Sequence, residues 1–105
     1  MAESTRVIDV VTPLGFRAVC SVYKWERIVR IKHPAMLGRL EDVVQALQDP
    51  DVVRRSVADA EVVLFYRRIE LRWVCAVVKR AEGLGYLITA YPADKVKQGE
   101  VLWKR

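Results

Sequence analysis

His33 is the residue of this chain best suited to proton transfer near neutral pH, and it is the only histidine among 105 residues. Histidine is the side-chain type whose ordinary pKa lies nearest neutrality, so it often serves as a general acid or base. It follows a segment in which Trp25, Ile28 and Val29 have the i, i+3, i+4 spacing of an apolar helix stripe. Because Pro34 disfavours helical geometry at the preceding residue, we expect His33 at or just past the end of that helix.

A second set of polar groups lies in a β-like run near the C-terminus, Tyr86–Tyr91. Thr89 and Tyr91 are two positions apart, so in a strand their hydroxyls face the same side of the sheet. Hydroxyls of this kind can hydrogen-bond a phosphate, and the paired Arg67 and Arg68 offer guanidinium groups that grip phosphate in bidentate fashion. Threonine and tyrosine are also simply favoured in strands, and the pattern by itself favours that plainer interpretation. For the arginines, the plainer interpretation is a solvated strand face.

The hydrophobic pattern of the first half of the chain predicts helices. The most regular apolar stripe runs across Ala35–Gln48, and Asp49 and Pro50 then stop it. The stripe consists of Leu37, Leu40, Val43, Val44 and Leu47. We therefore expect a helix over this range, after the shorter one that precedes His33.

The second half of the chain is rich in β-branched and aromatic residues, which predicts strands. The three main strands are expected at Val62–Ile69, Leu71–Val78 and Tyr86–Tyr91. The last two are joined by a glycine-containing hairpin loop. Shorter strands fit the pattern at Arg6–Val11, at Phe16–Val22, within Asp51–Ser56 and at Val101–Trp103.

Helices that precede a meander of strands indicate an α+β fold. We expect N-terminal helices packed on one face of an antiparallel sheet of about four strands, in a single domain over residues 1–105. Strand alternation places Trp73, Cys75 and Val77 on one apolar face, and the helix over 35–48 is expected to pack there. The other face would then present Thr89 and Tyr91 to a cleft.

The charge balance favours a polyanionic partner. Eighteen Lys and Arg residues against thirteen Asp and Glu residues give a formal net charge of +5. Moderate positive charge of this kind is compatible with binding to RNA or DNA, although many proteins without such partners share it.

The composition also limits which cellular compartment and which cofactors we expect for this chain. Cys20 and Cys75 are far apart in apolar runs, which is typical of buried thiols in a reducing compartment. With a single histidine, they do not supply the ligand set of a metal site. No apolar run approaches the roughly 20 residues that span a bilayer, and no N-terminal apolar segment resembles a signal peptide. We therefore expect a cytoplasmic protein without metal, cofactor or membrane partner.

Five stretches of the chain form a recognisable series. They are W-E-x-I-x-x-x-x-H-P at Trp25–Pro34, L-E-D-V-V-Q-A-L-Q-D-P-D at Leu40–Asp51, F-Y-R-R at Phe65–Arg68, W-V-C-A-V-V at Trp73–Val78 and I-T-A-Y-P-A-D-K-V-K-x-G-E at Ile88–Glu100. Together they cover about residues 20–103. In this series the chain resembles small phage- and plasmid-borne members of the barnase–EndoU–colicin–RelE-like nuclease superfamily. It departs from the better-known branches in having one histidine where they use two.

The resemblance implies a metal-independent endoribonuclease, often a toxin, that cleaves RNA by attack of the 2′-hydroxyl on the phosphodiester. The residues that it marks as catalytic are His33, Arg67, Arg68, Thr89 and Tyr91. RNA-binding cations are expected at Arg30, Lys32, Arg72, Lys95 and Lys97. Besides RNA, the partners that it leaves open are a protein antitoxin and a second copy of the chain.

A second interpretation fits the same sequence. On the same fold, the chain would be a non-catalytic basic module that binds RNA or a protein. Only the ribonuclease needs His33, because phosphodiester transesterification requires a group that moves a proton.

Overall fold

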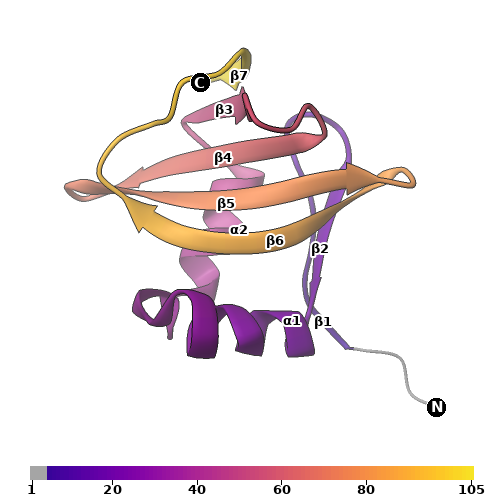
Figure 1. The fold of residues 1–105 in the computed structure, drawn as a ribbon, viewed down its shortest axis with the longest axis vertical. Coiled ribbons are helices and arrows are strands. Elements are labelled where there is room, and N and C mark those ends of the chain that lie inside the picture. The colour runs from indigo at the N-terminus through magenta and orange to yellow at the C-terminus, as the bar shows by residue number, and fades with distance from the viewer. Residues whose placement is uncertain (1–4) are drawn as a thin grey trace.

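Three long strands form the centre of the molecule. The computed structural model describes residues 5–105 and arranges β4 (Val62–Ile69), β5 (Arg72–Ala81) and β6 (Leu84–Ala93) as an antiparallel meander (Figure 1). The turn between β4 and β5 uses Glu70 in the left-handed region, at φ 57°. The turn between β5 and β6 uses Glu82 and Gly83 in the same region, at φ 56° and 82°. The expected meander is therefore present, and its turns are tight.

Four short strands extend the meander to a seven-stranded mixed sheet in the order β1-β2-β6-β5-β4-β3-β7. The short strands are β1 (Arg6–Val11), β2 (Arg17–Ser21), β3 (Val52–Arg55) and β7 (Val101–Lys104). β1 and β2, both expected as strands, form an antiparallel hairpin, and β2 pairs in parallel with the start of β6. The α+β class is confirmed, but the sheet has more strands than the four or so predicted, and one of its strand pairings is parallel. Parallel pairing joins segments that are distant in sequence, so hydrophobic alternation within either segment does not reveal it.

Two helical regions separate the hairpin from the meander. α1 (Val22–Arg27) begins at Ser21, whose Oγ accepts a hydrogen bond from the Lys24 N–H at 3.0 Å. It continues as one π-helical turn, η1 (Ile28–Lys32), and a 3₁₀ turn, η2 (Pro34–Met36), follows. In Figure 1, α1 lies below the β6 side of the sheet, and α2 (Leu40–Gln48) lies behind the sheet.

The second helix starts later than its apolar stripe predicts. It begins at Leu40 rather than Ala35, because the 3₁₀ turn at Pro34 and Gly38, in the left-handed region at φ 79°, interrupt the helical path. Leu37 therefore does not belong to the buried stripe, and 68% of it is exposed. The rest of the prediction holds, since Val43 and Leu47 are fully buried.

The helices pack on the opposite sheet face from the one predicted. The helix-covered face, called the helix face here, carries Val63, Phe65, Val74, Ala76 and Val78, which share one core with Val43, Ala46 and Leu47 of α2. Leu64, Tyr66, Cys75, Val77 and Tyr91 lie on the other face, which we call the open face, with Trp73 packed against them. The prediction that Trp73, Cys75 and Val77 meet the helix was therefore wrong. Both faces of the central strands are apolar, so alternation fixes which residues share a face but not which face the helix covers.

Both cysteines are buried and free, as expected for small core residues. Burial raises the pKa of the Cys20 thiol to about 11, which keeps it protonated at neutral pH. Among residues 5–105, no helix is long and apolar enough to cross a bilayer.

Candidate functional site

His33 is held in place by its own backbone between two helical turns. Its N–H donates to the Ile28 carbonyl at 2.7 Å, and its carbonyl accepts from the Met36 N–H at 2.9 Å. Its backbone leaves helical geometry there (φ −142°, ψ 78°), as Pro34 at the next position requires. η1 and η2 both contact β6, so this fixed backbone brings the half-buried side chain to the margin of the sheet.

Tyr91 is the strand residue that meets His33. The two rings lie 5.5 Å apart, centroid to centroid, with their planes inclined at 41°. These residues are far apart in the sequence, so only the tertiary fold joins them. The fold therefore places two of the residues predicted to be catalytic, His33 and Tyr91, against each other.

A β-bulge in β6 changes which face of the sheet the side chains of its C-terminal half occupy. Val78 pairs with Leu87 and Val77 pairs with Thr89, so Ile88 is the additional residue on β6. Leu87 therefore lies in the helix-face core, whereas Thr89 lines a cleft with Val77 on the open face. Strict alternation predicts that Leu87 and Thr89 share a face, and the bulge explains why they do not. Tyr91 follows Thr89 onto the open face.

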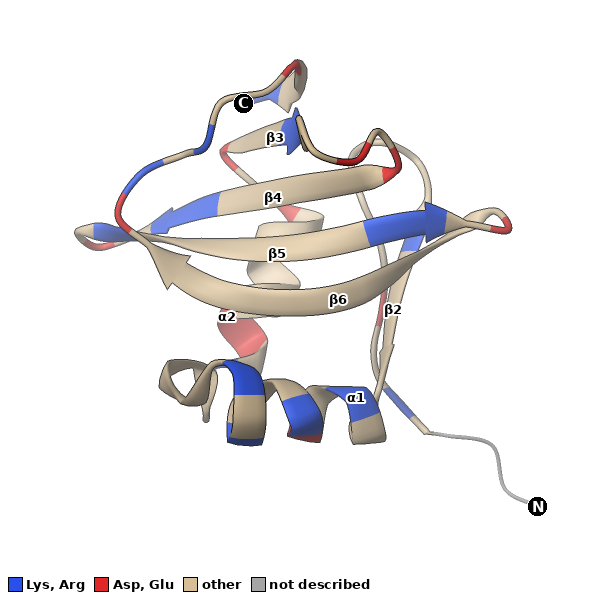
Figure 2. Ribbon diagram, viewed as in Figure 1, with Lys and Arg blue, Asp and Glu red and all other residues tan. Residues whose placement is uncertain are grey.

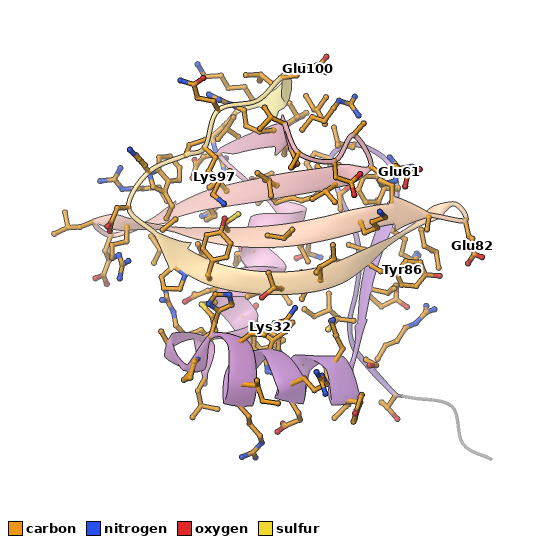
Figure 3. All side chains as sticks on the ribbon, in the orientation of Figure 1. Lys32, Glu61, Glu82, Tyr86, Lys97 and Glu100 are labelled. Atoms are coloured by element: carbon orange, nitrogen blue, oxygen red, sulfur yellow. The ribbon has the colours of Figure 1, made fainter. Side chains whose placement is uncertain are left out.

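Lys97 also lies close to the Tyr91 ring. Its ammonium lies 5.5 Å from the centroid of the Tyr91 ring, within the range of a cation–π contact. Figure 3 shows Lys97 reaching from the segment between β6 and β7 over the viewer's side of the sheet. Tyr91 thus contacts an imidazole and an ammonium that come from separate segments of the chain.

Two hydrogen bonds fix the backbone of Lys97. Its N–H donates to the Tyr66 hydroxyl at 3.1 Å, and its carbonyl accepts from Arg54 Nη1 at 3.2 Å. Arg54 Nη1 also lies 3.4 Å from the Gly99 carbonyl. A Cβ at Gly99 would collide with the Arg55 carbonyl, so this position accepts only glycine without a shift of the backbone. The Lys97 backbone is therefore tied to β3 and β4.

The side chains beneath Lys97 include polar groups that are largely buried from water. Tyr66 and Cys75 are fully buried beside Tyr91. Burial raises the pKa of Tyr66 to about 12 and that of Cys75 to about 11. Burial is also the main reason that the pKa of Tyr91 is raised, with the neighbouring Cys75 and Tyr66 adding to the effect. All three groups are therefore protonated at neutral pH, and the two phenols are neutral hydrogen-bond donors.

Two hydroxyls of this region lack partners. Thr89 Oγ1 and Tyr91 Oη are covered and have no hydrogen-bond partner within residues 5–105. Buried hydroxyls nearly always have a partner, and leaving one unpaired is unfavourable. The site therefore holds an imidazole, an ammonium and two unused hydroxyls, which together can move a proton and stabilise an anion.

The arginines predicted for the site lie elsewhere. Arg67 points to the helix face, where its guanidinium pairs with the Asp49 carboxylate at 2.8 Å. Arg68 is on the open face, but its guanidinium lies 5.3 Å from the centroid of the Trp73 ring and its Nε donates to the Glu70 carbonyl. The structure therefore places His33 against Tyr91, which lines a cleft together with Thr89, and it places Arg67 on the other face of the sheet.

The predicted RNA-binding cations fall into two groups. Arg30 pairs with Glu26 at 2.6 Å and Arg72 pairs with Asp94 at 3.1 Å. Within the described part of the chain, Lys32, Lys95 and Lys97 have no carboxylate at ion-pairing distance. Figure 3 shows Lys32 between η1 and β6, facing the sheet. The free ammonium groups Lys32 and Lys97 therefore lie on the two sides of β6.

Charge is distributed around the sheet rather than over its centre. Figure 2 shows lysine and arginine along α1 and η1 and at the ends of β4 and β5, while the ribbon of β6 carries no charge. The margins of the sheet therefore carry charges of both signs, whereas β6 carries none.

Two clefts open near β6. One, of about 430 Å³, is lined by Thr89, Tyr91, Lys97 and Gln98 together with residues of β4, β5 and the loop before β4. The other, of about 470 Å³, lies between β2, α1 and the start of β6, and Arg6, Lys24 and Tyr86 line it. The second cleft is slightly larger but contains none of the residues predicted to be catalytic. The first adjoins the His33–Tyr91 contact and is the better candidate.

No family model, curated protein or solved structure matches this chain at a significant level. Within residues 5–105, no group of three or more His, Cys, Asp or Glu side chains is arranged to hold a metal ion. The functional assignment therefore depends on the residues themselves.

Sequence reasoning missed the residues that support the site. Tyr66 and Arg54 hold Lys97, and Cys75 packs beneath Tyr91. A signal for Tyr66 was available, because a tyrosine inside an apolar strand usually has a partner for its hydroxyl. No local pattern indicates that Arg54 reaches a loop more than forty residues away.

Proposed function

We propose that this chain is a metal-independent endoribonuclease that cleaves RNA by attack of the 2′-hydroxyl on the adjacent phosphodiester. The observation that supports this proposal most strongly is the pairing of His33 with Tyr91, with the Lys97 ammonium on the same tyrosine. The resemblance to the barnase–EndoU–colicin–RelE-like superfamily points to the same reaction. A toxin-like, cytoplasmic role with a protein antitoxin belongs to this proposal.

The reaction moves one proton at each end. The 2′-oxygen loses its proton and bonds to phosphorus, the bond from phosphorus to the 5′-oxygen breaks, and the departing oxygen is protonated. His33 takes one of these two proton-transfer roles. Tyr91, whose ring lies against His33 and whose phenol is neutral, is the available O–H donor to the departing oxygen. Lys97 stabilises charge on the non-bridging oxygens, and Thr89 is a further donor to them.

The test is cleavage of a short single-stranded RNA in the presence of EDTA. We expect wild type to cleave it and to leave 2′,3′-cyclic phosphate ends. His33→Ala should reduce the rate roughly 10²- to 10⁴-fold, the range for loss of a general acid or base. Ile31→Ala is the matched control, because Ile31 is an exposed residue of η1 only two positions from His33. Its cleavage rate should stay close to that of wild type.

Intact folding of each variant is checked by circular dichroism and thermal unfolding. Equal rates for wild type and His33→Ala would disprove the role of the histidine. An absence of cleavage together with salt-sensitive RNA binding would favour a basic RNA-binding module. Within residues 5–105, Lys32, Lys95 and Lys97 have no carboxylate at ion-pairing distance, and this observation supports the second candidate.

A further inference from the structure

The cleft of about 430 Å³ beside Tyr91 combines apolar walls with a polar end. Val62 and Leu64 of β4 and Val77 of β5 supply branched aliphatic walls. Thr89 and Tyr91 supply the hydroxyl-bearing side. The remaining lining residues are Ser56, Val57, Ala58, Lys97 and Gln98. Apolar walls with a few polar groups are typical of pockets that bind a small organic group.

The unpartnered hydroxyls indicate what that group must offer. Thr89 Oγ1 and Tyr91 Oη both belong to cleft-lining residues and have no partner in residues 5–105. Each can donate and accept a hydrogen bond. Lys97 and Gln98, which line the cleft near them, are long and exposed, so an entering group can displace their side chains. A planar ring with apolar faces and a hydrogen-bonding edge satisfies both the walls and the hydroxyls.

We propose that this cleft binds a purine base of the RNA, next to the phosphate at His33, Tyr91 and Lys97. This inference deepens the proposed ribonuclease and rests on it. The cleft shares Tyr91 and Lys97 with the candidate site, so a base within it belongs to a nucleotide adjoining the reacting phosphate. A purine is favoured over a pyrimidine because its two fused rings cover more of the aliphatic wall.

The first experiment measures base preference in cleavage. The substrates are single-stranded oligouridylates in which one internal position is A, G, C or U. Wild type should cleave beside A or G at least about tenfold faster than beside C or U, because the second ring of a purine buries more apolar surface against the aliphatic wall. Val77→Phe, which fills the cleft from its floor, should abolish that preference. Val101→Phe makes the same change on β7, outside the cleft, and should retain it.

A second variant separates loss of the cleft from loss of the fold. Ala58 is an exposed lining residue of the cleft, so Ala58→Phe narrows it without disturbing the core. It should reduce the purine preference as Val77→Phe does. A purine preference that both variants leave intact, with folding confirmed by circular dichroism, would overturn the inference.

The second experiment measures the binding of single nucleotides, which requires no cleavage. Adenosine, guanosine, cytidine and uridine 5′-monophosphates are titrated into ¹⁵N-labelled protein. The purine nucleotides should shift the amide resonances of residues 56–58 and 89–91 more than the pyrimidine nucleotides do. Cleavage of RNA with no base preference and no such shifts would remove the subsite and leave the ribonuclease. Purine-selective shifts in a protein that cleaves no RNA would remove the ribonuclease and leave the subsite.

Discussion

The two faces of the central sheet carry different kinds of side chain. The helix face meets α2 mainly through aliphatic and aromatic side chains, including Val63, Phe65 and Leu47. The open face is also buried in part, yet it contains the phenols of Tyr66 and Tyr91 and the thiol of Cys75. The same strands supply both faces, because successive residues alternate between them. Under the proposed function, the helix face provides stability and the open face carries the chemistry.

Loss of packing on the helix face should have the largest effect. Leu47 is fully buried against the sheet, so Leu47→Ala removes apolar contact and leaves a cavity. We expect the free energy of unfolding to fall by roughly 2–5 kcal/mol, measured by urea denaturation. The folded fraction should retain the site on the other face. A loss below about 0.5 kcal/mol, the level of ordinary surface substitutions, would contradict the two-face comparison.

High pH should weaken the protein through its open face. The pKa of Cys75 is raised by burial to about 11, from 9.0. The unfolded chain therefore releases this proton first, and stability is lost as pH rises from about 9 to 11. The expected loss is at most about 1.4 kcal/mol per pH unit. Tyr66, with its pKa raised to about 12, adds a similar loss from pH 10 upwards.

Urea unfolding at pH 8, 9 and 10.5 measures this decline, and Cys75→Ala should make it shallower. Cys20, which is buried near Ser21 away from the site, supplies a parallel decline that remains in that variant. A free energy of unfolding that is flat from pH 8 to 10.5 would show that these groups are not sealed from water.

Removal of one open-face hydroxyl should stabilise the fold. Thr89 Oγ1 is covered and has no hydrogen-bond partner within residues 5–105. Thr89→Val therefore removes a buried polar group that makes no hydrogen bond in the protein without RNA. We expect a gain of about 1 kcal/mol, because replacing an unpaired buried hydroxyl with a methyl group is neutral or favourable. Thermal unfolding measures the change. RNA cleavage should fall in the same variant. This combination would show that the hydroxyl serves the reaction and not the stability of the fold.

Thr12→Val is the matched control for that experiment. Thr12 is also buried, but its hydroxyl donates to the Phe16 carbonyl at 3.1 Å. Its replacement should therefore cost about 1 kcal/mol. Destabilisation of both variants to the same extent would show that Thr89 has a partner after all.

The sequence predicts the elements of this fold better than their arrangement. Local patterns located the meander, the two N-terminal strands and the end of the first helix at His33, because each depends on neighbouring residues. The parallel contact of β2 with β6 and the choice of sheet face depend on distant packing, and both escaped prediction. The bulge at Ile88 has no local signature either, yet it decides which face Thr89 occupies.

The candidate site shows the same division. The residue types suited to phosphate chemistry singled out His33, Thr89 and Tyr91, and the fold brings His33 against Tyr91. The arginine pair was chosen for its charge, but charge alone does not reveal that Asp49 holds Arg67 on the helix face. Ion pairing is a tertiary property, and it separates the cations that remain free from those already engaged.

The smallest expected effect tests that separation. Lys97 has no carboxylate partner within residues 5–105, whereas the Arg72 guanidinium lies 3.1 Å from Asp94. We expect Lys97→Gln to lower the slope of log affinity against log salt by about 0.7, the value for one phosphate contact on single-stranded nucleic acid. Arg72→Gln should change the slope by less than half as much, because part of its charge is already neutralised. Fluorescence anisotropy with a labelled RNA, in a His33→Ala background that prevents cleavage, measures both slopes. Equal changes in the two variants would mean that ion pairing does not select the RNA-binding cations, and that net charge alone governs the affinity.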